Sequence, residues 1–222
     1  MSIVHPGYTL GSFRAKYHFA MKTATRTWTH TQFHNLYRHH SAKFHEWVHE
    51  ISKIPGRFAK HSADYVSFLA FTGLRTSEAA GIEWKHCNFG KGEILVEGPA
   101  ENGTKNGSFR RVPMIPETKK LLERLAGELE KPEPNRRVMN VREAQKSMDH
   151  AAAKVGMERI THHDLRHFFA TICIESGVDV PTVSRWLGHK DGGALAMKVY
   201  GHLRNEHSIA AAARVDFSAT VK

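Results

Sequence analysis

One segment of the sequence, THHDLRHFFATICIES, combines residue types that suit phosphate binding. Thr161 with Asp164 three residues later is a capping pattern, which predicts a helix starting here with His163 and Arg166 near its N-terminus. Because these two residues are three apart, they share one face of the helix. An imidazole and a guanidinium beside the positive end of a helix suit an anion such as phosphate. Taken alone, the pair is equally typical of a solvated face with an intrahelical His–Arg contact.

The apolar residues of the same segment predict how the helix packs. They recur at i, i+3, i+4 and i+7, so they are expected to gather on the side opposite the polar pair, with the two faces cleanly separated. These residues are Leu165, Phe168, Phe169 and Ile172.

Two further candidates follow downstream. In DVPTVSRWLGHK, Gly188 marks a helix end, and His189 directly after it can project from a turn rather than into a core. About one helix later, AMKVYGHL presents Tyr200. A single tyrosine on a mixed helix is usually a half-buried packing residue, so Tyr200 indicates chemistry only in combination with the others.

Three charged residues lie upstream. TGLRTSEAAGIEW places Arg75 in a predicted turn between two helices, with Glu78 three residues later. GTKNGSFRRVPM contains Lys105 near the predicted tip of a β-hairpin, because Asn–Gly pairs separate two short strands here. Each feature is common by itself, whereas the ordered set is not.

The elements that must position these residues are mostly helices. Two strands are predicted at 92–97 and 109–114. The chain is therefore expected to be α+β and mainly α-helical, with a small antiparallel hairpin or sheet on one side. The predicted helices cover 63–71, 116–130, 141–155, 161–174, 181–187, 194–203 and 209–215, with one or two more within 31–54.

Composition limits the class of partner. The 222 residues contain 32 Lys and Arg against 22 Asp and Glu, a formal charge of +10, which favours a polyanion over a merely basic, soluble surface. Cys87 and Cys173 lack the CxxC spacing of zinc or redox sites, so both are expected to be buried thiols in a reduced, cytoplasmic protein. No secretion signal and no apolar run of the ~20 residues of a membrane helix is found, so no membrane partner is expected.

In this order and context, the residues make the chain resemble the catalytic domain of the tyrosine recombinases, the phage-integrase family of site-specific DNA recombinases. The resemblance covers roughly residues 28–214. It implies six catalytic residues and one supporting carboxylate, with no metal and no other cofactor. The catalytic residues are Arg75, Lys105, His163, Arg166, His189 and Tyr200, and the supporting carboxylate is Glu78.

The resemblance also implies how the phosphate would be held. A phosphodiester gains negative charge as a nucleophile adds, so cations are needed around its non-bridging oxygens. Arg75 and Arg166 are expected to supply them, since guanidinium forks match phosphate geometry and stay protonated. His189 is expected to donate a further hydrogen bond, and Glu78 to orient a catalytic arginine or His163.

The remaining roles concern proton and strand transfer. Tyr200 is the implied nucleophile, and because the reference pKa of tyrosine is ~10 it needs a base, for which His163 is the candidate. Lys105, carried on the hairpin, would protonate the departing 5′ oxygen. The product would be a 3′-phosphotyrosyl ester, which a second DNA hydroxyl can attack without ATP.

The expected domain organisation follows the family. Residues 1–27 are expected to be an N-terminal arm or linker remnant, 28–204 the catalytic domain, and 205–222 a helical tail that docks on a neighbouring protomer. The expected partners are double-stranded DNA and further copies of the chain, forming a tetramer on DNA.

Three other functions remain open at this point. A type IB topoisomerase-like enzyme would share the chemistry but only relax DNA. A DNA-binding remnant would keep the basic surface without catalysis. A metal-dependent phosphodiesterase would be built on His162, His163 and Asp164.

Overall fold

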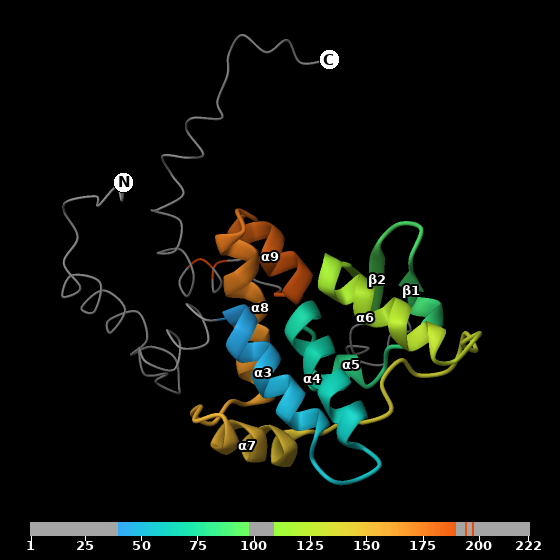
Figure 1. The fold of residues 1–222 in the computed structure, drawn as a ribbon. Coiled ribbons are helices and arrows are strands. Elements are labelled where there is room, and N and C mark those ends of the chain that lie inside the picture. Colours follow the sequence, from blue (N-terminus) through green and yellow to red (C-terminus); the bar gives the residue numbers. More distant parts are fainter. Residues whose placement is uncertain (1–39, 98–108, 190–193, 195–196, 198–222) are drawn as a thin grey trace, which may run out of the picture. The chain divides into compact units, whose positions relative to one another are not determined.

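The computed structural model describes residues 40–97, 109–189, 194 and 197 (Figure 1). The chain divides into two units, Met1–Phe44 and His45–Lys222, and the described site residues all lie in the second. Lys105, Tyr200 and the predicted helix at 209–215 lie outside the described residues. Of the predicted helix at 194–203, only Ala194 and Met197 are described, and both are helical.

The described part is mainly α-helical with one small antiparallel sheet, which confirms the predicted fold class. The sheet has the strand order β1-β2-β3. Its strands are β1 (Cys87–Asn88), β2 (Glu93–Glu97) and β3 (Phe109–Pro113). The helices are α3 (His40–Ser52), α4 (Ala59–Thr72), α5 (Thr76–Ala79), the 3-10 turn η1 (Trp84–His86), α6 (Pro116–Gly127), α7 (Gln145–Lys154), α8 (His162–Glu175) and α9 (Val180–Leu187).

The sheet has one buried face, and its register follows from the alternation of residues in β2 and β3. Ile94 pairs with Val112, and both are fully buried together with Val96. Since successive side chains of a strand point to opposite faces, the residues between them face outward. The third strand, β1, was not predicted, because two residues are too few to show an alternating pattern.

Helix α4 lies at the centre of the core and packs against both α8 and α6 (Figure 1). The helix is buried on most of its circumference, and its buried residues include the polar Ser62, Asp64, Ser67 and Thr72 beside the apolar ones. Hydrogen bonds attach the neighbouring elements: Thr118 on α6 donates to the Phe71 carbonyl at 2.7 Å, and Trp47 on α3 donates to the Met148 carbonyl on α7 at 3.1 Å.

Several predicted boundaries shift for local reasons. Helix α6 stops at Gly127 rather than at residue 130: the amides of Leu129 and Glu130 donate three residues back, to Ala126 and Gly127, and Glu130 has a φ of 59°, outside the right-handed helical region. Helix α7 begins at Gln145 rather than at 141, since the Ala144 amide donates to the His162 ring Nε2 at 3.3 Å instead of to a carbonyl of its own helix.

Cys87 and Cys173 are both buried free thiols, as predicted. In the part of the chain that the structure describes, no helix could span a membrane.

Gly73 ends α4 beside Phe169 of α8 and Leu187 of α9. Its φ is 64°, and a Cβ added there would lie 2.5 Å from Phe169 Cδ1 and 2.9 Å from Leu187 Cδ2. A side chain would therefore meet both a left-handed backbone and two core side chains. The close packing of three helix segments requires glycine at this position.

Gly73→Ala is expected to lower the free energy of unfolding by about 3 kcal/mol, since ~1–2 kcal/mol of backbone strain adds to the cost of overpacking. Gly92→Ala is the matched control, because Gly92 has the same φ of 64° and nothing within 4 Å of its added Cβ. Urea denaturation of both variants measures the difference. Equal losses in the two variants would contradict a packing role for Gly73.

Candidate active site

Arg75 stands at the start of α5, in the turn after α4, which confirms the predicted turn position. Its backbone amide donates to Glu78 Oε2 at 2.8 Å, and its guanidinium Nη1 donates to Glu78 Oε1 at 3.0 Å. The Arg75 side chain is still 49% exposed. The guanidinium is thus anchored by a carboxylate and remains accessible to an anion.

Glu78 is a buried carboxylate shared between two arginines. Besides Arg75, it accepts hydrogen bonds from Arg110 Nη1 at 2.8 Å and Nη2 at 2.7 Å. Burial is the largest influence on the Glu78 pKa and raises it, but hydrogen bonds from Arg110 and the Arg75 amide outweigh burial, so the pKa stays below its ordinary value. Glu78 is therefore ionised at neutral pH and holds Arg75 in place.

Arg166 lies where three helices meet and is only 5% exposed. Its Nη1 donates to the Gly73 carbonyl at 2.7 Å, and its Nη2 donates to the Leu187 carbonyl at 2.5 Å. These carbonyls belong to the C-terminal ends of α4 and α9, where the helix dipoles favour a cation. Arg166 thereby joins the start of α8 to the segments that lead to Arg75 and His189.

This burial corrects the prediction that α8 has cleanly separated polar and apolar faces. Leu165 and Phe169 are buried as predicted, but Arg166 is buried as well, and Phe168 and Ile172 are only half-buried. The ends of α4 and α9 cover the face that carries Arg166. Helical periodicity alone shows only one apolar stripe and cannot show a second packed face lined by backbone carbonyls.

His163 is exposed in the first turn of α8. The predicted helix start is confirmed, because the Thr161 amide donates to Asp164 Oδ2 at 2.7 Å. The Nε2 atoms of His163 and His167 are 3.0 Å apart, and the two rings meet edge-to-face. One of these nitrogens donates and the other accepts, so the tautomers of the two rings are linked.

His189 follows Gly188, which ends α9 with a φ of 71°, as the sequence predicted. The His189 amide donates to the Ser184 carbonyl at 3.1 Å, and the residue is half-buried. The structure thus brings Arg75, Arg166 and His189 to the joined ends of α4 and α9. His163 projects from the first turn of α8, the helix that carries Arg166.

The sequence profile of the phage integrase family matches residues 44–207. The chain belongs to this family. Tyrosine recombinase XerD of Lacticaseibacillus casei is 30% identical to this chain over an alignment of 152 residues, which covers 63% of this chain and 49% of that protein. The chain spans about half the length of the curated relatives it matches.

Solved structures share the fold of this chain. The catalytic domain of bacteriophage HP1 integrase aligns with a TM-score of 0.57 at 20% identity, covering 82% of this chain and 96% of that one. The Tn1549 transposon integrase in complex with transposon right end DNA aligns with a TM-score of 0.56 at 18% identity, covering 77% and 65%. At these identities the likeness shows the fold, which is that of tyrosine recombinase catalytic domains.

Arg110 is a residue of this candidate site that the sequence did not single out. A signal for it exists in FRRVP, because Val112 faces the core and Arg110, two residues earlier, must share that face. An arginine on the buried side of a short strand indicates a buried partner, here Glu78.

The residues of the phosphodiesterase alternative have separate partners in the structure. His162 Nε2 accepts from the Ala144 amide, Asp164 caps α8, and His163 contacts His167. Over residues 40–97 and 109–189, no group of three or more His, Cys, Asp or Glu side chains could hold a metal ion.

His167 is expected to make the stability of this domain depend on pH. Burial first, and then the proximity of His163, lowers the pKa of His167 from 6.5 to about 4. Between these values the unfolded chain binds more protons than the folded chain, so stability must fall as the pH drops from 6.5 towards 4.

His167→Gln should therefore lose less stability than the wild-type protein between pH 7 and pH 5, as measured by thermal unfolding. His150→Gln, which changes an exposed histidine on α7, should keep the wild-type pH dependence. An unchanged dependence in His167→Gln would show that protonation of this ring does not limit folding.

Proposed function

We propose that this chain is the catalytic part of a site-specific DNA recombinase, which cuts and rejoins strands through a 3′-phosphotyrosyl intermediate at Tyr200 without metal or ATP. The observation that carries the proposal is the position of Arg166, whose guanidinium donates hydrogen bonds to the carbonyls of Gly73 and Leu187. Those residues lie two positions before Arg75 and His189, so three predicted phosphate ligands converge.

The converging cations suit a phosphoryl-transfer site. As the nucleophile adds to phosphorus, negative charge grows on the non-bridging oxygens, and preorganised donors lower the barrier most where that charge develops. Arg75 is anchored by Glu78 and still exposed, which leaves donors for one oxygen. Arg166 and His189 are proposed to contribute from the α8 and α9 side.

Proton transfer is assigned to His163 and Lys105. The exposed ring of His163 can take the proton of the Tyr200 hydroxyl, and its contact with His167 would fix which ring nitrogen carries the lone pair. Lys105 would protonate the 5′ oxygen as the phosphorus–oxygen bond breaks. Because the phosphotyrosyl ester retains the bond energy, attack by a 5′ hydroxyl of another strand restores the DNA backbone and releases Tyr200.

DNA is proposed as the substrate on two grounds. The chain carries a formal charge of +10, which favours a polyanion. The Tn1549 integrase, which shares the fold, was solved in complex with transposon right end DNA. We propose a cytoplasmic location for the reaction, where the DNA of a bacterial cell lies.

A covalent-trapping assay tests the proposed function. Duplexes built from the DNA that flanks the gene carry a nick just downstream of the scissile phosphate. The short fragment that bears the released 5′ hydroxyl then diffuses away, and the adduct on the other side of the break accumulates. We expect a protein–DNA adduct that survives denaturant, forms in excess EDTA and maps to Tyr200. Adduct that requires a divalent ion would favour the metal-dependent alternative, and relaxation of plasmids lacking any defined site would favour the topoisomerase alternative.

Assembly on DNA is proposed to need the C-terminal tail. A chain truncated after Arg204 should stay monomeric and folded, and should form fewer multimers on DNA than the full chain, because residues 205–222 would dock on a neighbouring protomer. Analytical ultracentrifugation with the duplex present measures this. Equal multimer formation by the truncated and full chains would count against docking of the tail.

A further inference from the structure

Arg110 is an inward-facing arginine on the strand that returns from the Lys105 hairpin. Its side chain is 14% exposed, whereas that of the adjacent Arg111 is 69% exposed and pairs with Glu93 on the same sheet. Burying a guanidinium is costly unless its donors are satisfied by good partners. The strand therefore holds two sequential arginines in very different environments.

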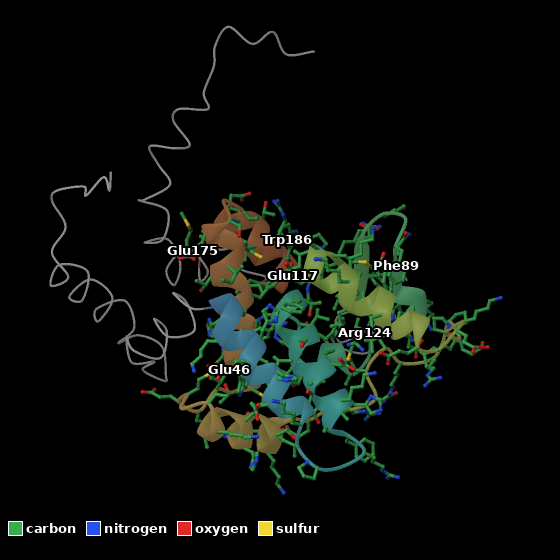
Figure 2. The ribbon with its side chains drawn as sticks, in the orientation of Figure 1. Glu46, Phe89, Glu117, Arg124, Glu175 and Trp186 are labelled. Atoms are coloured by element: carbon green, nitrogen blue, oxygen red, sulfur yellow. The ribbon has the colours of Figure 1, made fainter. Side chains whose placement is uncertain are left out.

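All three nitrogens of the Arg110 guanidinium are engaged. Nη1 and Nη2 form a bidentate pair with the Glu78 carboxylate at 2.8 and 2.7 Å. Nε donates to the Trp186 carbonyl at 2.8 Å, near the end of α9, where Figure 2 labels Trp186. A fork of this kind fixes direction as well as distance, which a lysine cannot do.

The turn after α9 also packs directly on Arg110. A Cβ added to Gly188 would lie 2.9 Å from Arg110 Nη1, 3.0 Å from its Cδ and 3.1 Å from its Cζ. A side chain at Gly188 would therefore displace the Arg110 guanidinium from its partners, and the φ of 71° at Gly188 also favours glycine. The residue that leads into His189 is thus seated on the guanidinium of Arg110.

Arg110 also changes the charge that Arg75 presents. If Glu78 paired with Arg75 alone, one negative charge would offset the one positive charge of that guanidinium. Two arginines share the single carboxylate, and Arg75 gives it only Nη1 among its side-chain nitrogens. The cluster keeps a net positive charge, which leaves Arg75 able to bind an anion.

We propose that Arg110 is a positioning residue, which holds Glu78 and the end of α9 so that Arg75 and His189 face the same phosphate. The inference rests on the proposed function, and it adds a residue that connects the two sides of the site. Because β3 continues from the segment with Lys105, Arg110 also ties the base of that hairpin to the phosphate ligands.

Arg110→Lys tests the proposal, since it keeps the charge and removes the fork. The expected result is adduct formation slowed by about 10- to 100-fold at saturating DNA, because small misplacements of catalytic groups cost rates of this order. DNA affinity should stay within about threefold, since positioning acts on the transition state more than on binding. Arg111→Lys, the exposed neighbour, should react at the wild-type rate.

A methylphosphonate substrate separates positioning from a general defect in folding. Replacing a non-bridging oxygen by a methyl group removes the charge that the arginines neutralise. Arg110→Lys should therefore slow adduct formation less on this substrate than on ordinary DNA. A loosened fold would slow both substrates equally. If Arg110→Lys unfolds, Glu78→Gln weakens the same fork and should show the same substrate dependence.

The outcomes distinguish the two proposals. A wild-type chain that forms no adduct overturns the proposed function and this inference together. A wild-type chain that reacts, with Arg110→Lys reacting equally fast or being slowed equally on both substrates, overturns the inference alone.

Discussion

Tyr200→Phe is expected to abolish adduct formation, reducing the rate by on the order of a million-fold, as removal of a covalent nucleophile does in other enzymes. Phenylalanine lacks the oxygen that would bond to phosphorus but preserves the ring, so folding and DNA binding should be unchanged. The trapping assay and a DNA-binding titration measure the two effects separately.

Tyr65→Phe is the matched control for the same substitution. Burial raises the pKa of Tyr65 to about 12, and its hydroxyl donates to the Arg142 carbonyl at 3.0 Å. The variant should lose about 1 kcal/mol of stability, the usual worth of one hydrogen bond, and still form adduct. Adduct at the wild-type level in Tyr200→Phe would overturn the assignment of the nucleophile.

Lys105→Ala is expected to cleave ordinary DNA about 100- to 10,000-fold more slowly, the range typical of general acids, while cleaving a 5′-thio substrate nearly as fast as the wild-type protein. An alkoxide leaving group needs a proton in the transition state. A thiolate, whose conjugate acid has a pKa of ~8.5 in a cysteine-like thiol, can leave without one. Single-turnover cleavage of the two substrates measures the difference.

Arg75→Ala and Arg166→Ala should remain impaired on the 5′-thio substrate, because the non-bridging oxygens still gain charge. Lys91→Ala, which changes an exposed lysine in the turn before β2, should react normally on both substrates. If Lys105→Ala were harmless, or failed equally on both substrates, Lys105 would not be the general acid.

Local sequence patterns were sufficient where neighbouring residues decide the structure. The Thr161–Asp164 cap, the turn at Arg75 with Glu78 and the helix end at Gly188 each depend on contacts within a few residues. Such short-range contacts correspond to fixed residue spacings, which are visible in the sequence itself.

Contacts between distant segments left no such pattern. Glu78 and Arg110 are 32 positions apart, and Arg166 and Gly73 are 93 apart, so no local spacing joins either pair. The only trace of Arg110 is its alternation with Val112, and nothing around Arg166 shows that its face is covered.

The sequence by itself determined which residue types stand near each helix end, because caps, turns and periodicity are properties of a short stretch of chain. Only the tertiary structure decided that the ends of α4 and α9 meet on Arg166. It also decided that Arg110 and Arg75 both pair with the single carboxylate of Glu78. Packing selects these partners, since a buried guanidinium must find acceptors wherever the folded core places them.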